Sequence, residues 1–424
     1  MTYEEALAYI HSVTWKGSRP GLERITELLA GLGNPQDKLR FIHVAGTNGK
    51  GSFCAMTESV LRAAGYRTGL FISPFIKEFN ERICVNGKPI GDAELAAATA
   101  VVRPVADAMA DAPTEFELIT AIGFVHFVQV GCDVVVLETG MGGRLDSTNV
   151  IRDPLATVIT GIAMDHTAFL GDTVEKIAAE KAGILKKGAP VLWGGRDPVA
   201  RRVIEARAAE VGVPLTATED TPLTVREMTL SGTVADYGSW QGMHLPLLGT
   251  YQPRNMANVL AAIPLLRGAG LQISDGAVRQ GIAAVQWPGR FEKLCADPLI
   301  LSDGAHNPEG VDVAVDSIRA YFADKVLLLC GVMADKDYHG MVNTLSPIAA
   351  EAFTLTPDNP RALPAKDFAE AFRSAGIPAN GYDSVPEAVA AAVARAKETG
   401  KPLISLGSLY MYCEVTAALE ELLK

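Results

Sequence analysis

The chain has 424 residues with a formal net charge of −11, and 48% of its residues are hydrophobic whereas 21% are charged. These proportions supply enough apolar side chains for more than one folded core, which excludes a generally disordered chain. The acidic balance, without any strongly basic stretch, argues against a protein that coats nucleic acid.

The N-terminal sequence, the longest apolar stretch and the cysteine spacing indicate where the protein functions. The N-terminal sequence MTYEEALAYIHSV is acidic and amphipathic, unlike a secretory leader. The longest apolar stretch, 118–132, is too short to span a bilayer comfortably. The six cysteines show no CxxC spacing, which predicts reduced thiols. We therefore expect a cytoplasmic protein with no membrane or nucleic-acid partner.

Apolar runs alternate with helical stretches through the first part of the chain. This alternation is typical of an α/β fold with a mostly parallel sheet. Segment 215–250 is rich in Thr and Gly and lacks helical periodicity, so we expect a small β insertion there. The predicted strands are 40–45, 66–72, 133–137, 156–160 and 189–193, and the predicted helices are 52–64 and 173–186.

A second α/β series follows Trp287-Pro288-Gly289. We expect a first domain at 1–289, which includes the β insertion, and a smaller Rossmann-like α/β domain at 290–424. The predicted strands of the second series are 299–302, 326–330, 353–356 and 403–406, and its predicted helices are 308–322, 366–375 and 386–399.

The strongest local signal is the glycine-rich turn GTNGKGS between a predicted strand and a predicted helix. Such glycines let backbone N–H groups turn toward phosphate oxygens, and the helix N-terminus adds partial positive charge. Lys50 would reach the outer phosphates and the Ser52 hydroxyl would bind Mg²⁺. The spacing departs from the general phosphate-loop pattern, because Gly51 separates these two residues, and a ligand-free glycine turn is the alternative. We predict a nucleotide-binding phosphate loop formed by Gly46, Thr47, Asn48, Gly49, Lys50, Gly51 and Ser52.

A second glycine cluster, GMGGRLD, follows a buried strand that ends in Glu138. It imitates a dinucleotide fingerprint, but the last glycine of that pattern would fall at Leu145, so we reject this interpretation. Ligands of open α/β sheets sit at the carboxyl ends of strands, and Glu138 is therefore placed to hold Mg²⁺. A capping or solvated carboxylate is the alternative.

Several separated motifs occur in one order along nearly the whole chain. They are GTNGKGS (46–52), SPFIKEFNERI (73–83), ETGMGGRLDSTN (138–149), DHTAFLGDT (165–173), AEKAGI (179–184), QPRNMANVLAA (252–262), PGRFE (288–292), DGAHNP (303–308) and GSLY (407–410). Together these motifs closely resemble the folylpolyglutamate synthase and dihydrofolate synthase family, within the Mur ligase group of ATP-dependent amide-forming enzymes. Two positions depart from the family pattern: Phe75 stands where the family usually has the His of SPH, and Ala168-Phe169 stands where an acidic or polar residue followed by Trp is common.

The resemblance implies that the nucleotide is ATP and that the domain is a P-loop ATPase domain with two Mg²⁺ sites. Ser52 and Glu138 would serve the first, and Ser73, Glu138 and His166 the second, although a histidine ligand is unusual for Mg²⁺. It also implies that Lys181 is carbamylated by CO₂, which requires a lowered lysine pKa. The alternative, which its sequence context alone would favour, is that Lys181 is an ordinary solvent-exposed lysine on a helix.

The resemblance also assigns residues around the substrates. Asn255 would contact adenine, Arg290 would contact ATP, and Asp303 and His306 would act in catalysis beside the nucleotide and the incoming amino acid, together with Lys50 and Lys181. A helix-entry cap is the alternative for Asp303, and a turn serine is the alternative for Ser408, which would grip glutamate. The predicted folate-contacting residues are Gly21, Leu22, Glu23, Arg24, Phe116, Glu117, Asp146 and Ser147.

Two of these folate positions carry alternatives of their own. Phe116 could be ordinary core at the start of an apolar helix, although its ring suits a flat heterocycle. Glu23 and Arg24 could be a solvated charge pair and nothing more.

The implied activity is an ATP-dependent ligase that joins a folate or dihydropteroate carboxylate to L-glutamate through an acyl phosphate. The family is usually monomeric, so we expect a monomer. Two alternatives stay open at this point: a Mur-type ligase of cell-wall precursors, with the same chemistry on a nucleotide-sugar acceptor, and a P-loop ATPase that ligates nothing.

Overall fold

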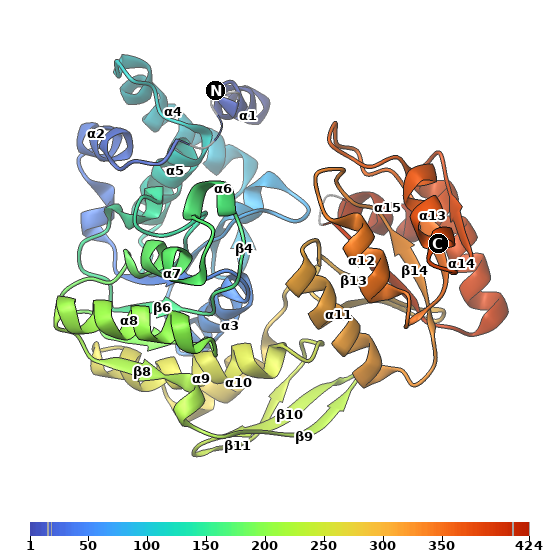
Figure 1. The fold of residues 1–424 in the computed structure, drawn as a ribbon. Coiled ribbons are helices and arrows are strands. Elements are labelled where there is room, and N and C mark those ends of the chain that lie inside the picture. The colour runs from blue at the N-terminus through green and yellow to red at the C-terminus, as the bar shows by residue number, and fades with distance from the viewer. Residues whose placement is uncertain (15–16, 18, 409–410, 424) are drawn as a thin grey trace. The chain divides into compact units, whose positions relative to one another are not determined.

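The computed structural model describes residues 1–14, 17, 19–408 and 411–423, and these form two compact units (Figure 1). The units are discontinuous in sequence, because the chain passes between them more than once. The first unit comprises residues 1–224, 235–244 and 254–285, and the second comprises residues 225–234, 245–253 and 286–424. The domain boundary expected at residue 290 stays a prediction.

An eight-stranded sheet forms the centre of the first unit, in the order β4-β3-β2-β5-β1-β6-β7-β8. All neighbouring strands from β2 to β8 pair in parallel, whereas β3 and β4 pair antiparallel at one edge. Its strands are β1 (Phe41–Ala45), β2 (Thr68–Phe71), β3 (Ile83–Val85), β4 (Lys88–Pro89), β5 (Val134–Glu138), β6 (Ala156–Ile159), β7 (Val191–Trp193) and β8 (Leu215–Ala217).

Helices cover both faces of this sheet (Figure 1). Alternate strand residues such as Phe41 and Leu137 face a core that they form with α1, α2, α4 and α5. Helix α3 contacts β1, β2 and β5, and α10 packs against α3. The helices before residue 286 are α1 (Tyr3–His11), α2 (Glu23–Gly31), α3 (Lys50–Ala63), α4 (Asp92–Ala108), α5 (Glu115–Gln129), α6 (Thr167–Leu170), α7 (Val174–Ala182), α8 (Pro198–Val211), α9 (Gln252–Gly268) and α10 (Asp275–Ala284), with short 3₁₀ helices η2 (Pro35–Lys38), η3 (Phe79–Arg82), η4 (Ser147–Val150) and η5 (Thr218–Asp220).

The segment predicted as a β insertion does contain a three-stranded sheet, formed by β9 (Leu223–Thr229), β10 (Gly232–Tyr237) and β11 (Trp240–Leu245). The prediction was wrong for its first residues, because β8 belongs to the large sheet and pairs with β7. The division between the two units also runs through these three strands.

The second unit is built on a six-stranded sheet, in the order β12-β13-β17-β14-β15-β16. Only β12 pairs antiparallel among the described pairings. Side chains of α11–α13 share a core with one face, and those of α14 and α15 share a core with the other. Its elements are β12 (Glu292–Ala296), β13 (Leu299–Asp303), α11 (Pro308–Tyr321), β14 (Val326–Cys330), α12 (Tyr338–Leu345), β15 (Ala349–Thr354), α13 (Ala365–Ser374), β16 (Ala379–Gly381), α14 (Val385–Thr399), β17 (Leu403–Leu406) and α15 (Tyr412–Leu422).

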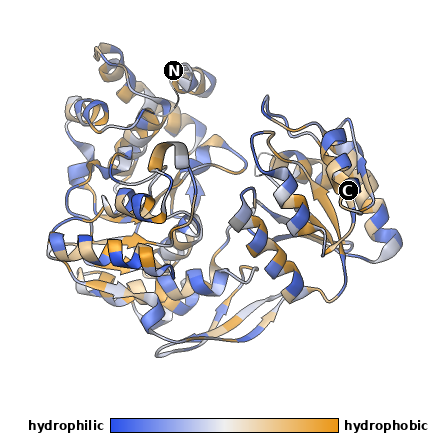
Figure 2. Cartoon of the chain, in the orientation of Figure 1, coloured by the Kyte–Doolittle hydropathy of each residue, from blue (hydrophilic) through white to orange (hydrophobic). Residues whose placement is uncertain are grey.

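These elements confirm the predicted α/β class, with a mostly parallel large sheet and a smaller Rossmann-like unit. Some boundaries were wrong: α3 begins earlier, at Lys50, α7 ends at Ala182 before its predicted end, and β15 starts at Ala349. Figure 2 shows hydrophobic colour on the sheet strands and alternating colours along α8, as expected for buried strands and a half-buried helix.

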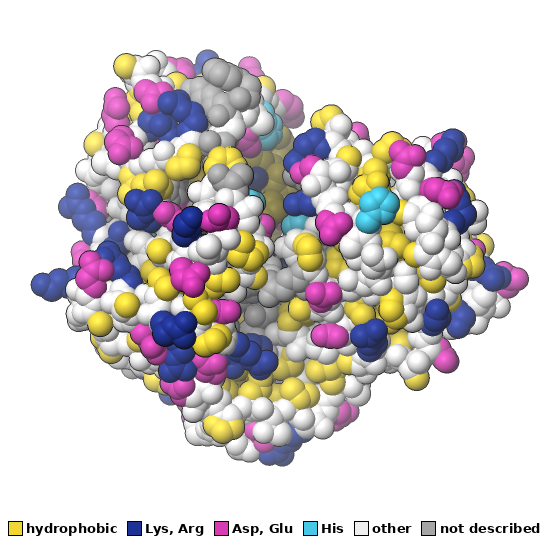
Figure 3. Space-filling model, viewed as in Figure 1, with side chains coloured by type: hydrophobic (Ala, Val, Ile, Leu, Met, Phe, Trp, Pro, Cys, Tyr) yellow, Lys and Arg dark blue, Asp and Glu magenta, His cyan; other side chains and the backbone are white. Residues whose placement is uncertain are grey.

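The molecular surface carries mixed charge. In the view of Figure 3, lysine and arginine side chains are interspersed with aspartate and glutamate. Among the described residues, no helix combines the length and the apolar character that a membrane span requires.

Candidate active site

The phosphate loop connects β1 to α3 at the carboxyl edge of the large sheet. Gly46 (φ 155°) and Gly49 (φ 83°) both have positive φ, which favours glycine. A Cβ on Gly46 would lie 2.0 Å from Thr160 Oγ1, and one on Gly49 would lie 2.6 Å from Asn255 Oδ1. Backbone shape and close neighbours therefore both require glycine at these two positions.

The neighbouring strand β6 anchors the loop. Thr47 N donates to Gly161 O at 2.7 Å, and Thr160 Oγ1 donates to Asn48 O at 2.8 Å. Because β1 and β6 are adjacent and parallel, the turns after both strands meet at one edge. Thr160 and Gly161 lie outside the motifs recognised in the sequence, and only the strand order reveals their contact with the loop.

Lys50, Glu138 and Ser73 come together from neighbouring elements. Lys50 Nζ lies 3.9 Å from Glu138 Oε1, and the Ser73 N–H donates to Glu138 Oε2 at 3.2 Å. Glu138 is buried (4% exposed), so the interpretation as a solvated carboxylate was wrong. A buried carboxylate beside the loop lysine supplies oxygen at the edge where a phosphate-bound cation would need it.

The other predicted metal ligands differ in their setting. Ser52 is buried in the first turn of α3, whereas the side chain of His166 is 54% exposed. His166 pairs with Asp165, and none of its described contacts reaches Glu138. The described residues contain no group of three or more His, Cys, Asp or Glu that could hold a metal. The oxygen donors fit Mg²⁺ bound jointly with phosphate and water, and all four ligand assignments stay predictions.

Lys181 on α7 is buried (4% exposed), which overturns its interpretation as a solvated helix charge. Its Nζ donates to Gly46 O at 2.8 Å. Burial, and then the charge of Lys50, lower the pKa of Lys181 to about 7. A substantial fraction of this amine is therefore neutral, and hence nucleophilic, near neutral pH.

Arg24 and Glu117 form a buried ion pair between α2 and α5. Arg24 Nε lies 3.1 Å from Glu117 Oε2, and the two residues are 8% and 1% exposed. Thr114 caps α5, with its N–H donating to the same Glu117 oxygen. The solvated-pair interpretation was therefore wrong for Arg24, although Glu23 is exposed.

The ring of Phe116 lies against the second glycine cluster. A Cβ on Gly140 would come within 2.6 Å of Phe116 Cζ, and the Phe71 ring is 6.0 Å away in an edge-on arrangement. Phe116 is half-buried and packs at the border of the core. The core interpretation therefore holds in part, and the stacking of Phe116 on a flat heterocycle stays a prediction.

Asp146 is buried, and both oxygens of its carboxylate accept hydrogen bonds. Met141 N donates to Oδ2 at 2.8 Å, and Thr148 donates to Oδ1 through both its backbone N–H and its hydroxyl. Burial raises the pKa of Asp146, while these donors act in the opposite direction. Ser147, the other predicted residue here, starts η4 and is buried.

The remaining candidates belong to the second unit. Asp303 accepts from Phe291 N at 2.8 Å, Ala305 N at 2.8 Å and Tyr251 Oη at 3.0 Å. The helix-entry-cap alternative was wrong for Asp303, because Asn307 caps α11. Tyr251 gave no signal in the sequence beyond its place before the QPRN motif.

Three further predicted residues lie near the ends of strands of this sheet. Arg290 precedes β12, His306 Nδ1 lies 2.8 Å from Gly304 O, and Ser408 is buried after β17. Leu409 and Tyr410 of the GSLY motif lie outside the described residues.

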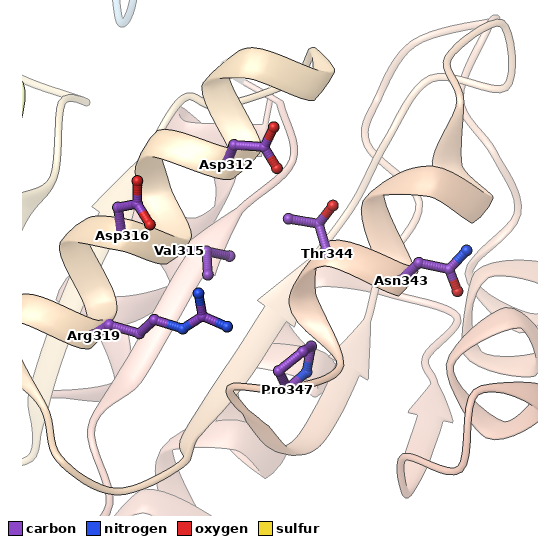
Figure 4. A pocket seen from close by; sticks show the side chains of 7 residues that line it. All are labelled: Asp312, Val315, Asp316, Arg319, Asn343, Thr344 and Pro347. Carbon is purple, nitrogen blue, oxygen red and sulfur yellow. The ribbon is translucent and has the colours of Figure 1, made fainter.

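Two surface hollows lie away from the phosphate loop. One, of about 410 Å³, includes Leu22 of the predicted folate residues in its lining. The other, of about 310 Å³, lies between α11 and α12 and includes Asp312, Asp316 and Arg319 (Figure 4). The second hollow contains none of the predicted site residues.

Comparisons with known proteins agree with this geometry. The Mur ligase middle domain matches residues 44–266, and the Mur ligase glutamate ligase domain matches residues 289–409. The chain is 39% identical to the folylpolyglutamate synthase of Lacticaseibacillus casei over 99% of both chains. It is 38% identical to the dihydrofolate synthase/folylpolyglutamate synthase of Bacillus subtilis, also over 99% of both.

Solved structures show the same fold. The folylpolyglutamate synthase of Mycobacterium tuberculosis, complexed with ADP and AMPPCP, has a TM-score of 0.87 at 30% identity, covering 99% of this chain and 98% of that one. The Escherichia coli FolC structure in complex with DHPP and ADP has a TM-score of 0.87 at 30% identity, covering 100% and 99%.

A phosphate loop with a lysine beside a buried carboxylate, followed by a second α/β unit, defines this chain as a Mur ligase and hence as an ATP-dependent ligase. Within that group, it belongs to the folylpolyglutamate synthase/dihydrofolate synthase family.

Proposed function

We propose that this enzyme uses ATP to join the carboxylate of a dihydropteroate or folate to the amino group of L-glutamate. The observation that carries the proposal is the convergence of Lys50, Glu138 and Ser73 at the phosphate loop, within a chain that matches its relatives from end to end. The Escherichia coli relative was solved with DHPP and ADP, which supports a pteridine acceptor and an adenine nucleotide here.

The chemical problem is that a carboxylate is a poor electrophile in water. Transfer of the terminal phosphoryl group of ATP converts the carboxylate into an acyl phosphate and leaves ADP. The glutamate nitrogen then attacks the acyl carbon, the bond to phosphate breaks, and the amine loses a proton as the amide forms. Catalysis of such steps is mainly positioning and electrostatic stabilisation.

The phosphate loop is proposed to bind the triphosphate through its backbone N–H groups, with Lys50 on the outer phosphates. Ser52, Ser73, Glu138 and His166 are the proposed Mg²⁺ ligands in two sites, and Mg²⁺ would neutralise the phosphate charge. A carbamylated Lys181 is proposed to help organise this region. Its burial and low pKa support the modification, because only the neutral amine reacts with CO₂.

The acceptor is proposed to bind on the first unit. The ring of Phe116 would stack on the pteridine, and the pocket would include Asp146, Ser147, Glu117 and the segment 21–24. The adenine is assigned to Asn255, next to Gly49. Arg290, Asp303, His306 and Ser408 keep their predicted roles toward ATP and glutamate.

A product assay tests this proposal. Purified enzyme is incubated with ATP, Mg²⁺ and labelled glutamate, with dihydropteroate or tetrahydrofolate as the acceptor. We expect a glutamylated product and phosphate release that require both glutamate and a pteridine acid. Ligation only to a nucleotide-sugar precursor would point to a cell-wall ligase. Phosphate release without any amide would identify an ATPase, and either result would overturn the proposal.

A further inference from the structure

A buried hydrogen-bond chain joins strand β1 to the predicted acceptor site. His43 lies at the middle of β1 and is fully buried, with Nε2 2.9 Å from Thr148 Oγ1. Thr148 Oγ1 lies 2.5 Å from Asp146 Oδ1, and Asp146 Oδ2 accepts from Met141 N. The roles assigned above to the site residues do not use His43 or Thr148.

The direction of each hydrogen bond follows from counting protons. The Thr148 hydroxyl has one proton, and an ionised Asp146 carboxylate has none, so the hydroxyl donates to Asp146. His43 Nε2 must then carry a proton and donate to the Thr148 oxygen. In the neutral ring, Nδ1 is left as an acceptor, and this atom has no partner among the described residues. Burial lowers the pKa of His43 to about 3, which keeps the ring neutral near neutral pH.

The chain ends on the surface that the acceptor would use. Asp146 ties the backbone of Met141 to the turn that begins η4. The adjacent Gly140 packs against the tip of the Phe116 ring, so closely that a Cβ there would lie 2.6 Å from Cζ. A shift of the Asp146 carboxylate would therefore also shift the backbone at Met141 and Gly140, against which the Phe116 ring packs.

We propose that His43 and Thr148 are positioning residues of the acceptor site, with His43 Nε2–H donating to Thr148 and Thr148 donating to Asp146. The proposal rests on the proposed function, in which Asp146 and Phe116 contact a pteridine acid. Neither His43 nor Thr148 touches the acceptor in this proposal, and both act through Asp146.

Variants at Thr148 provide the first test. Thr148→Val removes the hydroxyl at nearly constant volume, and Thr148→Ser restores it. We expect Thr148→Val to raise the KM for the pteridine acid roughly tenfold, the usual scale for losing a hydrogen bond to a charged group, while the KM for ATP stays unchanged. Thr148→Ser should recover most of the loss. An unchanged acceptor KM, or equal effects on acceptor and ATP, would overturn the proposal.

Variants at His43 keep the test valid if Thr148→Val does not fold. The side-chain amide of His43→Gln can donate in place of Nε2–H, whereas His43→Leu cannot. We expect His43→Gln to bind a dihydropteroate probe, followed by its fluorescence, more tightly than His43→Leu does. Equal binding by the two variants would contradict the proposed role of the Nε2–H group.

The tautomer can be measured without any turnover. ¹⁵N NMR of histidine-labelled enzyme should show one ring in the Nε2–H form, with a signal that disappears in His43→Gln and does not titrate between about pH 5 and 8. An Nδ1–H form would overturn the inferred direction. A wild-type enzyme that accepts no pteridine acid would instead refute the proposed function, and the tautomer result would stand separately.

Discussion

The side-chain nitrogen of Lys181 lies 2.8 Å from the carbonyl oxygen of Gly46, a residue 135 positions earlier in the chain. The contact joins α7 to the first residue of the phosphate loop. It keeps the lysine out of water and close to the charge of Lys50, and both effects disfavour the ammonium form.

The first prediction concerns CO₂ at Lys181. Because the pKa of this lysine is lowered to about 7, the neutral amine becomes more abundant as the pH rises through that value. With dissolved CO₂ held constant, activation by CO₂ should therefore increase from about pH 6 to 8. Enzyme prepared with ¹³CO₂ should show a carbamate signal in ¹³C NMR. Lys181→Arg should lose both effects and exposed Lys187→Ala neither, so a signal that survives in Lys181→Arg would refute the assignment.

The second prediction concerns Lys50. Lys50→Ala should lower the glutamate-dependent rate of phosphate release by about a hundredfold or more, because in the proposed function it removes the positive charge placed next to the transferred phosphoryl group. Lys176→Ala, which changes an exposed lysine on α7, serves as the control. Nearly full activity in Lys50→Ala would place the triphosphate elsewhere.

The third prediction concerns Gly140, which packs against the tip of the Phe116 ring. A methyl group on Gly140 would lie 2.6 Å from Phe116 Cζ, so Gly140→Ala must displace the ring. Steady-state kinetics should show a higher KM for the pteridine acid and an unchanged KM for ATP. Gly268→Ala is the matched control, because a Cβ there meets nothing within 4 Å. A rise in the ATP KM alone would argue against the ring as part of the acceptor site.

The fourth prediction concerns the buried pair Arg24–Glu117. Arg24→Ala leaves the Glu117 carboxylate buried without its cation, which should lower the free energy of unfolding by about 3–5 kcal/mol. The exposed pair Lys176–Asp172 provides the comparison, since Lys176→Ala should leave the free energy of unfolding nearly unchanged. Urea unfolding measures both.

A double variant tests whether the uncompensated charge of Glu117 causes the loss of stability in Arg24→Ala. Glu117→Gln in the Arg24→Ala background removes the uncompensated charge and should recover part of the stability. If the double variant were less stable than Arg24→Ala, the desolvated carboxylate would not be the source of the loss.

The sequence predicted the elements whose signals are local. The apolar run before Glu138 and the glycine turn at 46–52 both lie where they were expected, since strand patterns and turn glycines depend on near neighbours. The burial of Arg24 and of Lys181 was missed because each depends on a partner far along the chain, at Glu117 and Gly46. No periodicity within a single helix reports such a contact.

Strand order accounts for the other omissions. Thr160 lies near the phosphate loop only because β6 pairs with β1, and Tyr251 meets Asp303 only within the folded second unit. The small sheet shows the same limit, since the assignment of β8 to the large sheet depends on a pairing with β7.

The discontinuous chain course bears on how this enzyme can be divided for study. Leu248 belongs to the second unit's core, and Thr250 and Tyr251 bond to Ser317 and Asp303, although all three precede residue 286. Dividing the gene at residue 286 would leave Leu248 on an amino-terminal fragment without the core it packs in. The carboxyl-terminal fragment would have an incomplete hydrophobic core. Co-expression of the two pieces, rather than either alone, is the arrangement in which each could recover its native partners.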